Sequence, residues 1–266
     1  MKIRFGICTY NRKELVELTA RSLKNIHGYE KIELCIYDDC STDYDESFLR
    51  EQYPTAHKIV VREDNVGADQ NTAWMMQDYI SSDADVLFIA DSDLIFRKDV
   101  LSTIEHGVNK GYEFFSLFNA NGHRKIADFN DEFIEKDYVG AAGVCLSRRI
   151  CKIILDEVQD QKKAFDWVLC DVLKERGLKI ICSQESQVQH IGLAGQNSSI
   201  KSFDYGRNFE CDSLENAQQI ENLFEKYIDL SVNNAEELNN RINAMENSLS
   251  WRITSPLRFL AKYFRK

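Results

Sequence analysis

The sequence predicts an α/β fold, an α/β/α sandwich with a mostly parallel central sheet, followed by a C-terminal helical extension. Up to residue 183, short runs of β-branched and apolar residues alternate with longer runs of helical periodicity, as in repeated β–α units. The run 85–90 (DVLFIA) is apolar almost throughout, which is typical of a central strand covered on both faces. We therefore expect one α/β domain over residues 1–212 and a helical extension over 213–266.

Strands are expected where β-branched and aromatic residues cluster between polar segments. These are residues 3–8, 32–37, 58–62, 85–90, 113–118, 141–146 and 178–183. Helices are expected where apolar residues recur every three or four positions. These are residues 11–26, 68–80, 148–158 and 164–177. The first helix starts with Asn11 and Glu14 at the spacing of a capping box, and the last ends at Gly177.

The extension after residue 212 shows no strand pattern, and two helices are expected in it. The first is marked by Leu214, Ala217, Ile220 and Leu223, and the second by Ala235, Leu238, Ile242, Met245 and Leu249. The second set has the 3, 4, 3, 4 spacing of a heptad, so a homodimer through these helices is one expectation. The tail 251–266 carries five basic residues and no acidic one, and is expected to bind an anionic membrane surface. Packing of the tail on its own domain or on a partner's helix is the alternative.

The composition limits the class of protein. The 266 residues carry a formal net charge of −10, which argues against general nucleic-acid binding because phosphate contacts require Lys and Arg. The eight cysteines are spread singly, without a C-x-x-C pair, which favours buried thiols in a reducing compartment over zinc or disulfides. The N-terminus lacks a signal-peptide pattern, and no apolar run approaches the roughly 20 residues that span a bilayer. A cytoplasmic protein is expected.

Carboxylates follow two of the expected strands, at the edge of the sheet where open α/β folds bind ligands. Asp38, Asp39, Asp91 and Asp93 should therefore lie close together. Such carboxylates repel one another unless a cation or hydrogen-bond donors compensate. A hard divalent cation with oxygen ligands does so and recruits a phosphorylated substrate. We expect Asp93 to hold a metal ion and the metal to hold a diphosphate.

Seven segments in order resemble the motif series of GT-A glycosyltransferases of family 2. They are FGICTYNR, IYDDCSTD, NVGADQN, IADSD, VGAAGVCLSRR, FDWVLCDVLKERG and VQHIG, and the resemblance covers roughly residues 3–200. It implies that residues 1–212 form a GT-A catalytic domain. The stretch SWRITSPLR in the tail resembles the C-terminal tail of many bacterial polysaccharide glycosyltransferases.

The resemblance implies a role for each matching residue. Asp93 and His190 would bind Mn²⁺ or Mg²⁺, and Asp166 would be the catalytic base. The expected nucleotide-sugar-binding residues are Thr9, Tyr10, Asn11, Arg12, Asp38, Asp39, Asn65, Gly67, Asn71, Asp91, Ser92, Gly140, Ala141, Ala142 and Gly143. Thr9, Asp38 and Asp39 would hold the base and ribose, Asp91 the ribose, and Gly140 to Gly143 the donor sugar.

The sequence departs from the family pattern at two positions. Phe165 stands where a Glu usually precedes the base, and Gln70 stands where many relatives carry a basic residue that contacts the diphosphate. Asp171 is an alternative base, although it would lie about 140° around the helix from Asp166. Purely structural roles are the alternative for these residues: residues 38–39 and 91–93 would form turns, and residue 166 would cap a helix.

The implied function is metal-dependent, inverting transfer of a hexose or N-acetylhexosamine from a nucleotide diphosphate sugar, with UDP as the expected nucleotide. The implied acceptor is a hydroxyl of a growing bacterial surface glycan, which could be lipid-linked, at the inner face of the cell membrane. Two alternatives stay open. One is an inactive binding or scaffold protein on this fold. The other is a sugar-1-phosphate nucleotidyltransferase, although its glycine-rich N-terminal loop is missing here.

Overall fold

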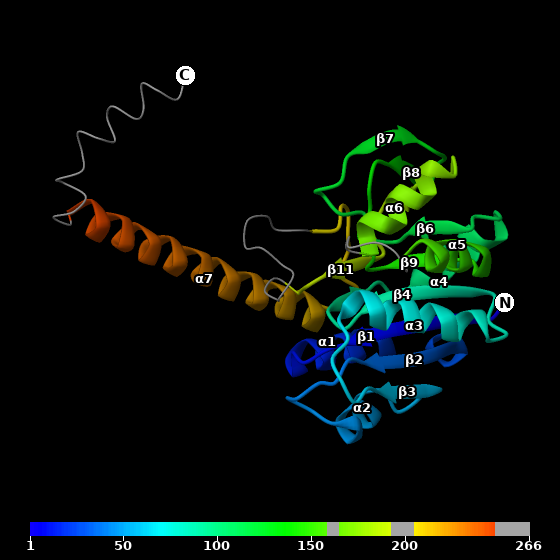
Figure 1. Cartoon of the computed structure of the whole chain (residues 1–266), viewed down its shortest axis with the longest axis horizontal. Helices are drawn as coiled ribbons and strands as arrows, with labels where there is room; N and C mark the ends of the chain where they lie inside the picture. Colours follow the sequence, from blue (N-terminus) through cyan, green and yellow to red (C-terminus); the bar gives the residue numbers. More distant parts are fainter. Residues whose placement is uncertain (159–164, 193–204, 248–266) are drawn as a thin grey trace. The chain divides into compact units, whose positions relative to one another are not determined.

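The computed structural model describes residues 1–158, 165–192 and 205–247 (Figure 1). Its two compact units are Met1–Ala217 and Gln218–Lys266. The elements in chain order are β1 (Ile3–Thr9), α1 (Lys13–Lys24), a 3-10 turn (Tyr29–Lys31), β2 (Ile32–Asp38), α2 (Glu46–Gln52), β3 (Lys58–Val61), α3 (Ala68–Ile80), β4 (Val86–Asp91), β5 (Leu94–Phe96), α4 (Val100–Asn109), β6 (Phe114–Ser116), β7 (Lys125–Asp128), β8 (Phe133–Lys136), β9 (Val144–Leu146), α5 (Arg148–Val158), α6 (Phe165–Glu175), β10 (Ile181–Ser183), β11 (Val188–His190) and α7 (Leu214–Asn247).

A nine-stranded sheet forms the centre of the first unit, in the order β3-β2-β1-β4-β9-β6-β10-β8-β7. Only β9 and β8 run against their neighbours, so the other seven of these nine strands share one direction. This arrangement confirms the predicted α/β fold with a mostly parallel sheet. A separate two-stranded sheet pairs β5 with β11.

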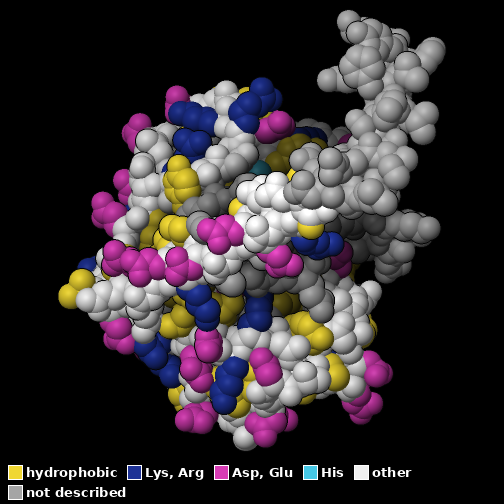
Figure 2. All heavy atoms as spheres, turned by 90° about the vertical axis from the view of Figure 1, so that its left-hand side faces the viewer, with side chains coloured by type: hydrophobic (Ala, Val, Ile, Leu, Met, Phe, Trp, Pro, Cys, Tyr) yellow, Lys and Arg dark blue, Asp and Glu magenta, His cyan; other side chains and the backbone are white. Residues whose placement is uncertain are grey.

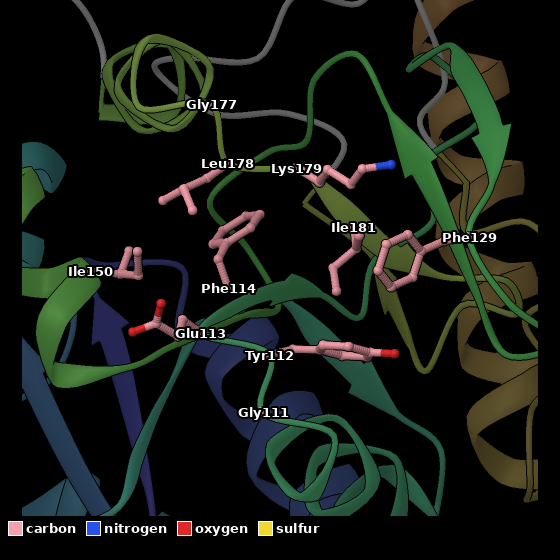
Figure 3. Close-up of a pocket in the computed structure, with 10 residues that line it drawn as sticks. All are labelled: Gly111, Tyr112, Glu113, Phe114, Phe129, Ile150, Gly177, Leu178, Lys179 and Ile181. Carbon is pink, nitrogen blue, oxygen red and sulfur yellow. The ribbon is translucent and has the colours of Figure 1, made fainter.

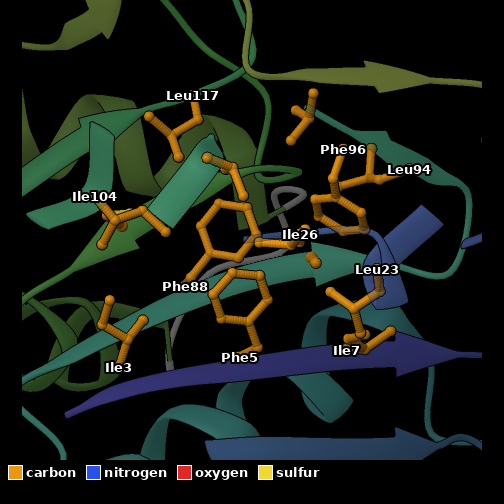
Figure 4. Close-up of a cluster of buried hydrophobic side chains, with 14 of the residues drawn as sticks. Ile3, Phe5, Ile7, Leu23, Ile26, Phe88, Leu94, Phe96, Ile104 and Leu117 are labelled. Carbon is orange, nitrogen blue, oxygen red and sulfur yellow. The ribbon is translucent and has the colours of Figure 1, made fainter. Parts of the chain in front are cut away.

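Side chains of the central strands alternate between two cores, one on each face of the sheet. In β4, Phe88 belongs to the core that α1, α2 and α4 cover, whereas Leu87 and Ile89 belong to the core that α3, α5 and α6 cover. Figure 4 shows the first core, where the rings of Phe5 and Phe88 have their centroids 4.6 Å apart. Burial on both faces explains why this strand is apolar throughout.

The cysteines contribute to these cores. Five of the eight are buried, and none of the eight, all of which lie in the described ranges, forms a disulfide. Burial raises the pKa of the Cys182 thiol to about 12, so this side chain is uncharged and packs as a small apolar group.

The predicted helices 68–80 and 148–158 coincide with α3 and α5. The start of the first helix was predicted wrongly. α1 begins at Lys13, and Arg12 precedes it in a left-handed conformation without a side-chain cap, so Asn11 and Glu14 form no capping box. Asn11 instead bonds to the loop after β2, as described below. Short elements such as α2, α4, β5 and β7 carry no clear pattern and were not predicted.

The two helices expected after residue 212 are one continuous helix, α7, which runs to Asn247. No glycine or proline lies between 214 and 247 to end the first of them. Leu238, Ile242 and Met245 are exposed on it. Of the described helices, none combines the length and the apolar character needed to span a membrane. Acidic and basic side chains are interspersed on the face that Figure 2 shows.

Candidate active site

The carboxyl ends of β1, β2 and β4 lie side by side and bring predicted site residues together. Thr9 pairs with Asp38 in the register of β1 and β2, and Cys8 pairs with Asp91 in the register of β1 and β4. The N–H of Ser92 continues this alignment by donating to the Cys8 carbonyl over 3.1 Å. The turn residues therefore converge on one edge of the sheet.

Asp38 holds this edge together from within. It is 1% exposed, and its carboxylate accepts hydrogen bonds from the Thr9 hydroxyl (2.8 Å), the Ser41 N–H (2.9 Å) and the Ser41 hydroxyl (2.6 Å). Three donors leave this buried carboxylate little capacity to accept from a ligand. Asp38 therefore fixes the loop after β2 against the end of β1.

Asn11 joins the same loop from the other side. Its N–H donates to the Ser41 hydroxyl, and its side-chain oxygen accepts from the Thr42 N–H, both over 2.7 Å. These bonds hold Asn11 and Arg12 at φ values of 51° and 59°, where residues other than glycine are uncommon. The half-buried Tyr10 precedes this strained pair. Thr9, Asn11, Asp38 and residues 41–42 form one hydrogen-bonded wall of the site.

Asp39 organises a second wall in front of α3. Its two oxygens accept from the N–H groups of Val66 and Gly67, each over 2.9 Å. The side-chain amide of Asn65 donates to the Asp39 carbonyl over 3.1 Å. Gly67 has φ 87°, and no atom lies within 4 Å of the place where its Cβ would be, so open space adjoins this loop.

Asn71 and Arg62 close the base of this wall. Asn71 is buried, donates to the Tyr37 carbonyl over 2.8 Å and accepts from Arg62 Nε over 2.9 Å. The Arg62 guanidinium stacks on Trp74 at 3.7 Å from the ring centroid. Its charge interacts with Asp39. Sequence reasoning missed Arg62, although its place directly after strand β3 was a signal that could have identified it.

Asp93 is a second almost fully buried carboxylate at this edge. Its Oδ2 lies 2.7 Å from Arg12 Nη1 and 3.3 Å from His190 Nε2. Its Oδ1 is buried and has no hydrogen-bond partner, and the same holds for the neighbouring Ser92 hydroxyl. Asp91, the last residue of β4 and two positions earlier, is half-buried.

The environment of Asp93 keeps it ionised. Burial alone would raise its pKa, but the His190 imidazole and the Arg12 guanidinium outweigh this effect and lower the pKa to about 2. Asp93 therefore carries a negative charge at any physiological pH.

The small sheet of β5 and β11 positions His190. Its register places His190 opposite Leu94, and the Ile191 N–H donates to the Asp93 carbonyl over 2.9 Å. The chain passes so close that a Cβ on Gly192 would lie 2.0 Å from Asp93 Oδ2. Residues 93 and 190 thus meet although nearly a hundred positions separate them.

Residues 140–143 lie beside the end of β4. The Gly143 N–H donates to the Ile89 carbonyl over 2.9 Å, and the Gly143 carbonyl accepts from the Leu117 N–H over 2.7 Å. Gly143 has φ 75°, and a Cβ there would lie 2.9 Å from Val188 Cγ2, so only glycine fits. Gly140, Ala141 and Ala142 are half-buried and form a small-residue surface.

Helix α6 is tied to the segment before this surface. The Tyr138 hydroxyl donates to Asp171 over 2.8 Å, and the ring of Trp167 lies 4.9 Å from that of Tyr138, with Trp167 56% exposed. α6 leads into β10, which runs in the direction of β4, so α6 begins near the carboxyl edge of the sheet. Asp166 is its second residue, and the position of its side chain lies outside what the structure describes.

Comparisons with known proteins agree with this geometry. Residues 5–120 match the model of Glycosyl transferase family 2. The structure resembles S. aureus TarS 1–349 in complex with UDP-GlcNAc, with TM-score 0.52 and 18% identity over 80% of this chain and 60% of that one. It also resembles GalNAc-T7 with UDP, GalNAc and Mn²⁺, with TM-score 0.59 and 11% identity over 71% of this chain and 44% of that one.

The family match and the shared fold support the resemblance to GT-A glycosyltransferases of family 2 that the motif series indicates. The matched residues 5–120 make up less than half of the chain. The likeness to the two solved structures concerns the fold, since identity is below a fifth. The chain spans 35% of the length of a longer TarS structure. The search of curated proteins returned no match.

GalNAc-T7 was solved with Mn²⁺, and the residues at the carboxyl edge of β4 in this protein fit a divalent cation. Asp93 offers a buried oxygen without a partner, and His190 offers an imidazole nitrogen beside it. Within the described residues, no three His, Cys, Asp or Glu side chains are grouped closely enough to form a complete protein cage. Two protein ligands suit a hard cation that completes its shell with phosphate oxygens and water.

A pocket of about 250 Å³ lies at the opposite edge of the GT-A sheet (Figure 3). Most of its lining comes from residues 111–114, 177–179 and 181, which precede or begin β6 and β10. Both strands run in the direction of β4, so their first residues lie away from Asp91. This pocket is separate from the edge that carries Asp38, Asp91 and Asp93.

The pairing of Asp93 predicts a pH-dependent stability. Because its folded-state pKa of about 2 lies below the ordinary 3.8, ionised Asp93 stabilises the fold above 3.8, and this stabilisation is lost as pH falls toward 2. Asp93→Asn should therefore lower the free energy of unfolding most at neutral pH and least in acid. Urea unfolding with a chelator, from neutral pH downward, measures this. Asp131→Asn, in an exposed loop, is the control. A destabilisation that grows in acid would contradict the charged assignment.

Proposed function

We propose that the protein transfers a hexose or N-acetylhexosamine from a UDP-linked donor to a hydroxyl of a growing bacterial surface glycan, with inversion and with Mn²⁺ or Mg²⁺. The observation that carries this proposal is the ionised, buried Asp93 beside His190 at the carboxyl edge of a family 2 domain. UDP is favoured because TarS 1–349 was solved with UDP-GlcNAc and GalNAc-T7 with UDP and GalNAc.

The donor would bind between the two walls described above. Asp38 and Asp39 already accept several hydrogen bonds from the neighbouring loops. We therefore assign to them chiefly the role of shaping the nucleotide pocket. Asp91, half-buried at the end of β4, is assigned to the ribose. Residues 140–143 would support the donor sugar, since small residues permit its close approach.

The metal would be held by Asp93 and His190, where it supplies Lewis-acid stabilisation of the leaving diphosphate. Because the cation would stabilise the negative charge of the leaving diphosphate, no side chain has to protonate the leaving group. The reaction needs one base, which accepts the proton of the acceptor hydroxyl as that oxygen attacks the anomeric carbon. We assign this role to Asp166, near the start of α6.

Asp171 is the alternative base. Its carboxylate accepts a hydrogen bond from the Tyr138 hydroxyl over 2.8 Å. A hydrogen bond that stabilises the charged form makes a carboxylate a weaker base. This observation favours Asp166. The contact also gives Asp171 a structural role, which is to fix Tyr138 next to the 140–143 surface.

The extension is proposed to control location and assembly. The basic tail 251–266 lies outside the described residues, and we propose that it attaches the protein to the inner face of the cell membrane, near a lipid-linked acceptor. The exposed Leu238, Ile242 and Met245 of α7 keep heptad spacing, and we propose that they pair with α7 of a second copy.

Donor binding tests the function directly. UDP-GlcNAc, UDP-glucose or UDP should raise the melting temperature in the presence of Mn²⁺ and much less with a chelator, because a ligand of the folded state stabilises it. Turnover should release UDP. Release of pyrophosphate would indicate a nucleotidyltransferase. Binding without turnover of any donor, in the presence of glycan acceptors, would favour the inactive binding protein.

The assignment of the base is tested by two matched variants. Asp166→Asn keeps the size of the side chain but cannot accept the proton, so kcat should fall roughly 10² to 10⁴-fold with donor binding nearly intact. Asp171→Asn should reduce kcat far less. Single-turnover rates and donor affinity by calorimetry separate the two effects. A larger loss from Asp171→Asn would move the base to that residue.

Deleting residues 251–266 tests both proposals about the extension. The truncated protein should no longer sediment with anionic vesicles, because each basic residue near such a surface contributes about 1 kcal/mol of binding. It should still sediment as a dimer in solution, since the heptad residues remain. Turnover of a soluble acceptor analogue should be unchanged. A truncated protein that stays on vesicles refutes the anchor, and a monomer refutes the pairing.

A further inference from the structure

Asp93, the proposed metal ligand, forms an ion pair with the guanidinium of Arg12 in this structure. Arg12 Nη1 lies 2.7 Å from Asp93 Oδ2, a charge-assisted hydrogen bond. The Asp93 side chain is 3% exposed, whereas the Arg12 side chain is 35% exposed. The arginine thus reaches from the solvent side to a buried carboxylate and compensates its charge.

The backbone aims Arg12 at this carboxylate. Arg12 lies at φ 59°, and its carbonyl accepts the N–H groups of Leu15 and Val16 at the start of α1. Asn11, also left-handed, is held by the loop after β2. Such a conformation persists only where surrounding bonds fix it. The root of the Arg12 side chain is therefore fixed, while its half-exposed end can swing toward solvent.

A divalent cation at Asp93 would meet this arginine. Both positive groups would share one buried carboxylate, where water screens their repulsion poorly. The backbone at Gly192 blocks the other side, since a Cβ there would lie 2.0 Å from Asp93 Oδ2 and 2.9 Å from Arg12 Nη1. A metal at the partnerless Oδ1 is therefore repelled for as long as Arg12 stays on Oδ2, and Arg12 can leave only outward.

We propose that Arg12 competes with the metal for Asp93 in the donor-free protein, and that the donor's diphosphate ends this competition by taking Arg12 as its own partner. The inference rests on the proposed function, because it concerns the same metal and donor. A diphosphate offers a guanidinium paired acceptor oxygens and adds negative charge beside the cation. Arg12 is thus a positioning residue that links metal binding to nucleotide binding.

The thermodynamic consequence is cooperativity between the two ligands. Metal alone binds weakly, because it must displace Arg12 without offering that arginine a new partner. Metal binds tightly together with the diphosphate, because the displaced Arg12 then forms an ion pair with the diphosphate. By reciprocity, the metal raises nucleotide affinity by the same factor.

Binding of Mn²⁺, measured by electron paramagnetic resonance of the free ion, tests the competition without any turnover. Arg12→Gln removes the charge while keeping a long polar side chain. It should tighten Mn²⁺ binding to the donor-free protein about tenfold, within the range typical of coupling between sites. The factor by which UDP improves Mn²⁺ binding should shrink accordingly. His190→Ala should act in the opposite direction and weaken Mn²⁺ binding in both states.

Two controls isolate the charge at position 12. Arg12→Lys keeps the positive charge and should keep Mn²⁺ affinity near the wild-type value. Arg149→Gln removes a charge of equal size from an exposed pair with Glu113, next to the pocket at the opposite edge of the sheet, and should change nothing. Melting curves verify that each variant is folded. Should Arg12→Gln fail to fold, wild-type protein with uridine or UDP gives a second measurement, in which only UDP should tighten Mn²⁺ binding.

Arg12→Gln protein that binds Mn²⁺ no tighter than wild type without UDP would overturn the competition, as would equal tightening by uridine and UDP. These results leave the proposed transferase intact. Wild-type protein that binds no Mn²⁺ even with saturating UDP overturns the metal-dependent function itself, and the competition with it.

Discussion

An ionised carboxylate with almost no exposed surface must receive compensating charge from the protein, and Asp93 receives it from two distant parts of the chain. Arg12 comes from the turn after β1, and His190 comes from β11 near the end of the α/β unit. The cost of leaving such a charge alone in the interior is large. This single requirement ties the family-matched segment to the part of the chain that follows it.

Two further carboxylates connect the loops at the carboxyl edge where Asp93 lies. Asp38 holds the turn after β1 to the turn after β2, and Asp39 holds the start of α3 to the same place. These carboxylates accept hydrogen bonds from backbone N–H groups, so the loops that form the walls are held together by the protein itself. The acidic residues at this edge therefore differ: Asp38 and Asp39 hold the loops, whereas Asp93 keeps one oxygen without a hydrogen-bond partner. Their sequence motifs alone do not distinguish the two kinds.

The features that could be predicted from the sequence are those that depend on local residue patterns. The helices α3 and α5 matched their expected bounds because their periodicity is long and uninterrupted, and β4 was placed in the centre because it is apolar on both faces. The placement of Asp38 and Asp91 at one edge followed from parallel strands of similar length. Each of these inferences depends on residues close together in the chain.

What could not be predicted depends on contacts between distant residues. The left-handed turn at Asn11 and Arg12 is imposed by hydrogen bonds from residues 41 and 42, so the apparent capping box is not formed. The pairing of β5 with β11 involves strands of three residues each, too short to show a period. The contact between Arg12 and Asp93 requires both features at once. No motif encodes it.

The close passage of the chain at Gly192 limits how this protein can diverge. A side chain there, even a methyl group, would displace Asp93 or the guanidinium beside it, so position 192 is closed to every residue except glycine. Tyr10, Asn65 and Ala142 have some exposed surface and no such restriction from a buried charge. Natural or laboratory evolution can reshape this edge of the sheet at those positions, while residue 192 stays fixed as long as Asp93 stays charged.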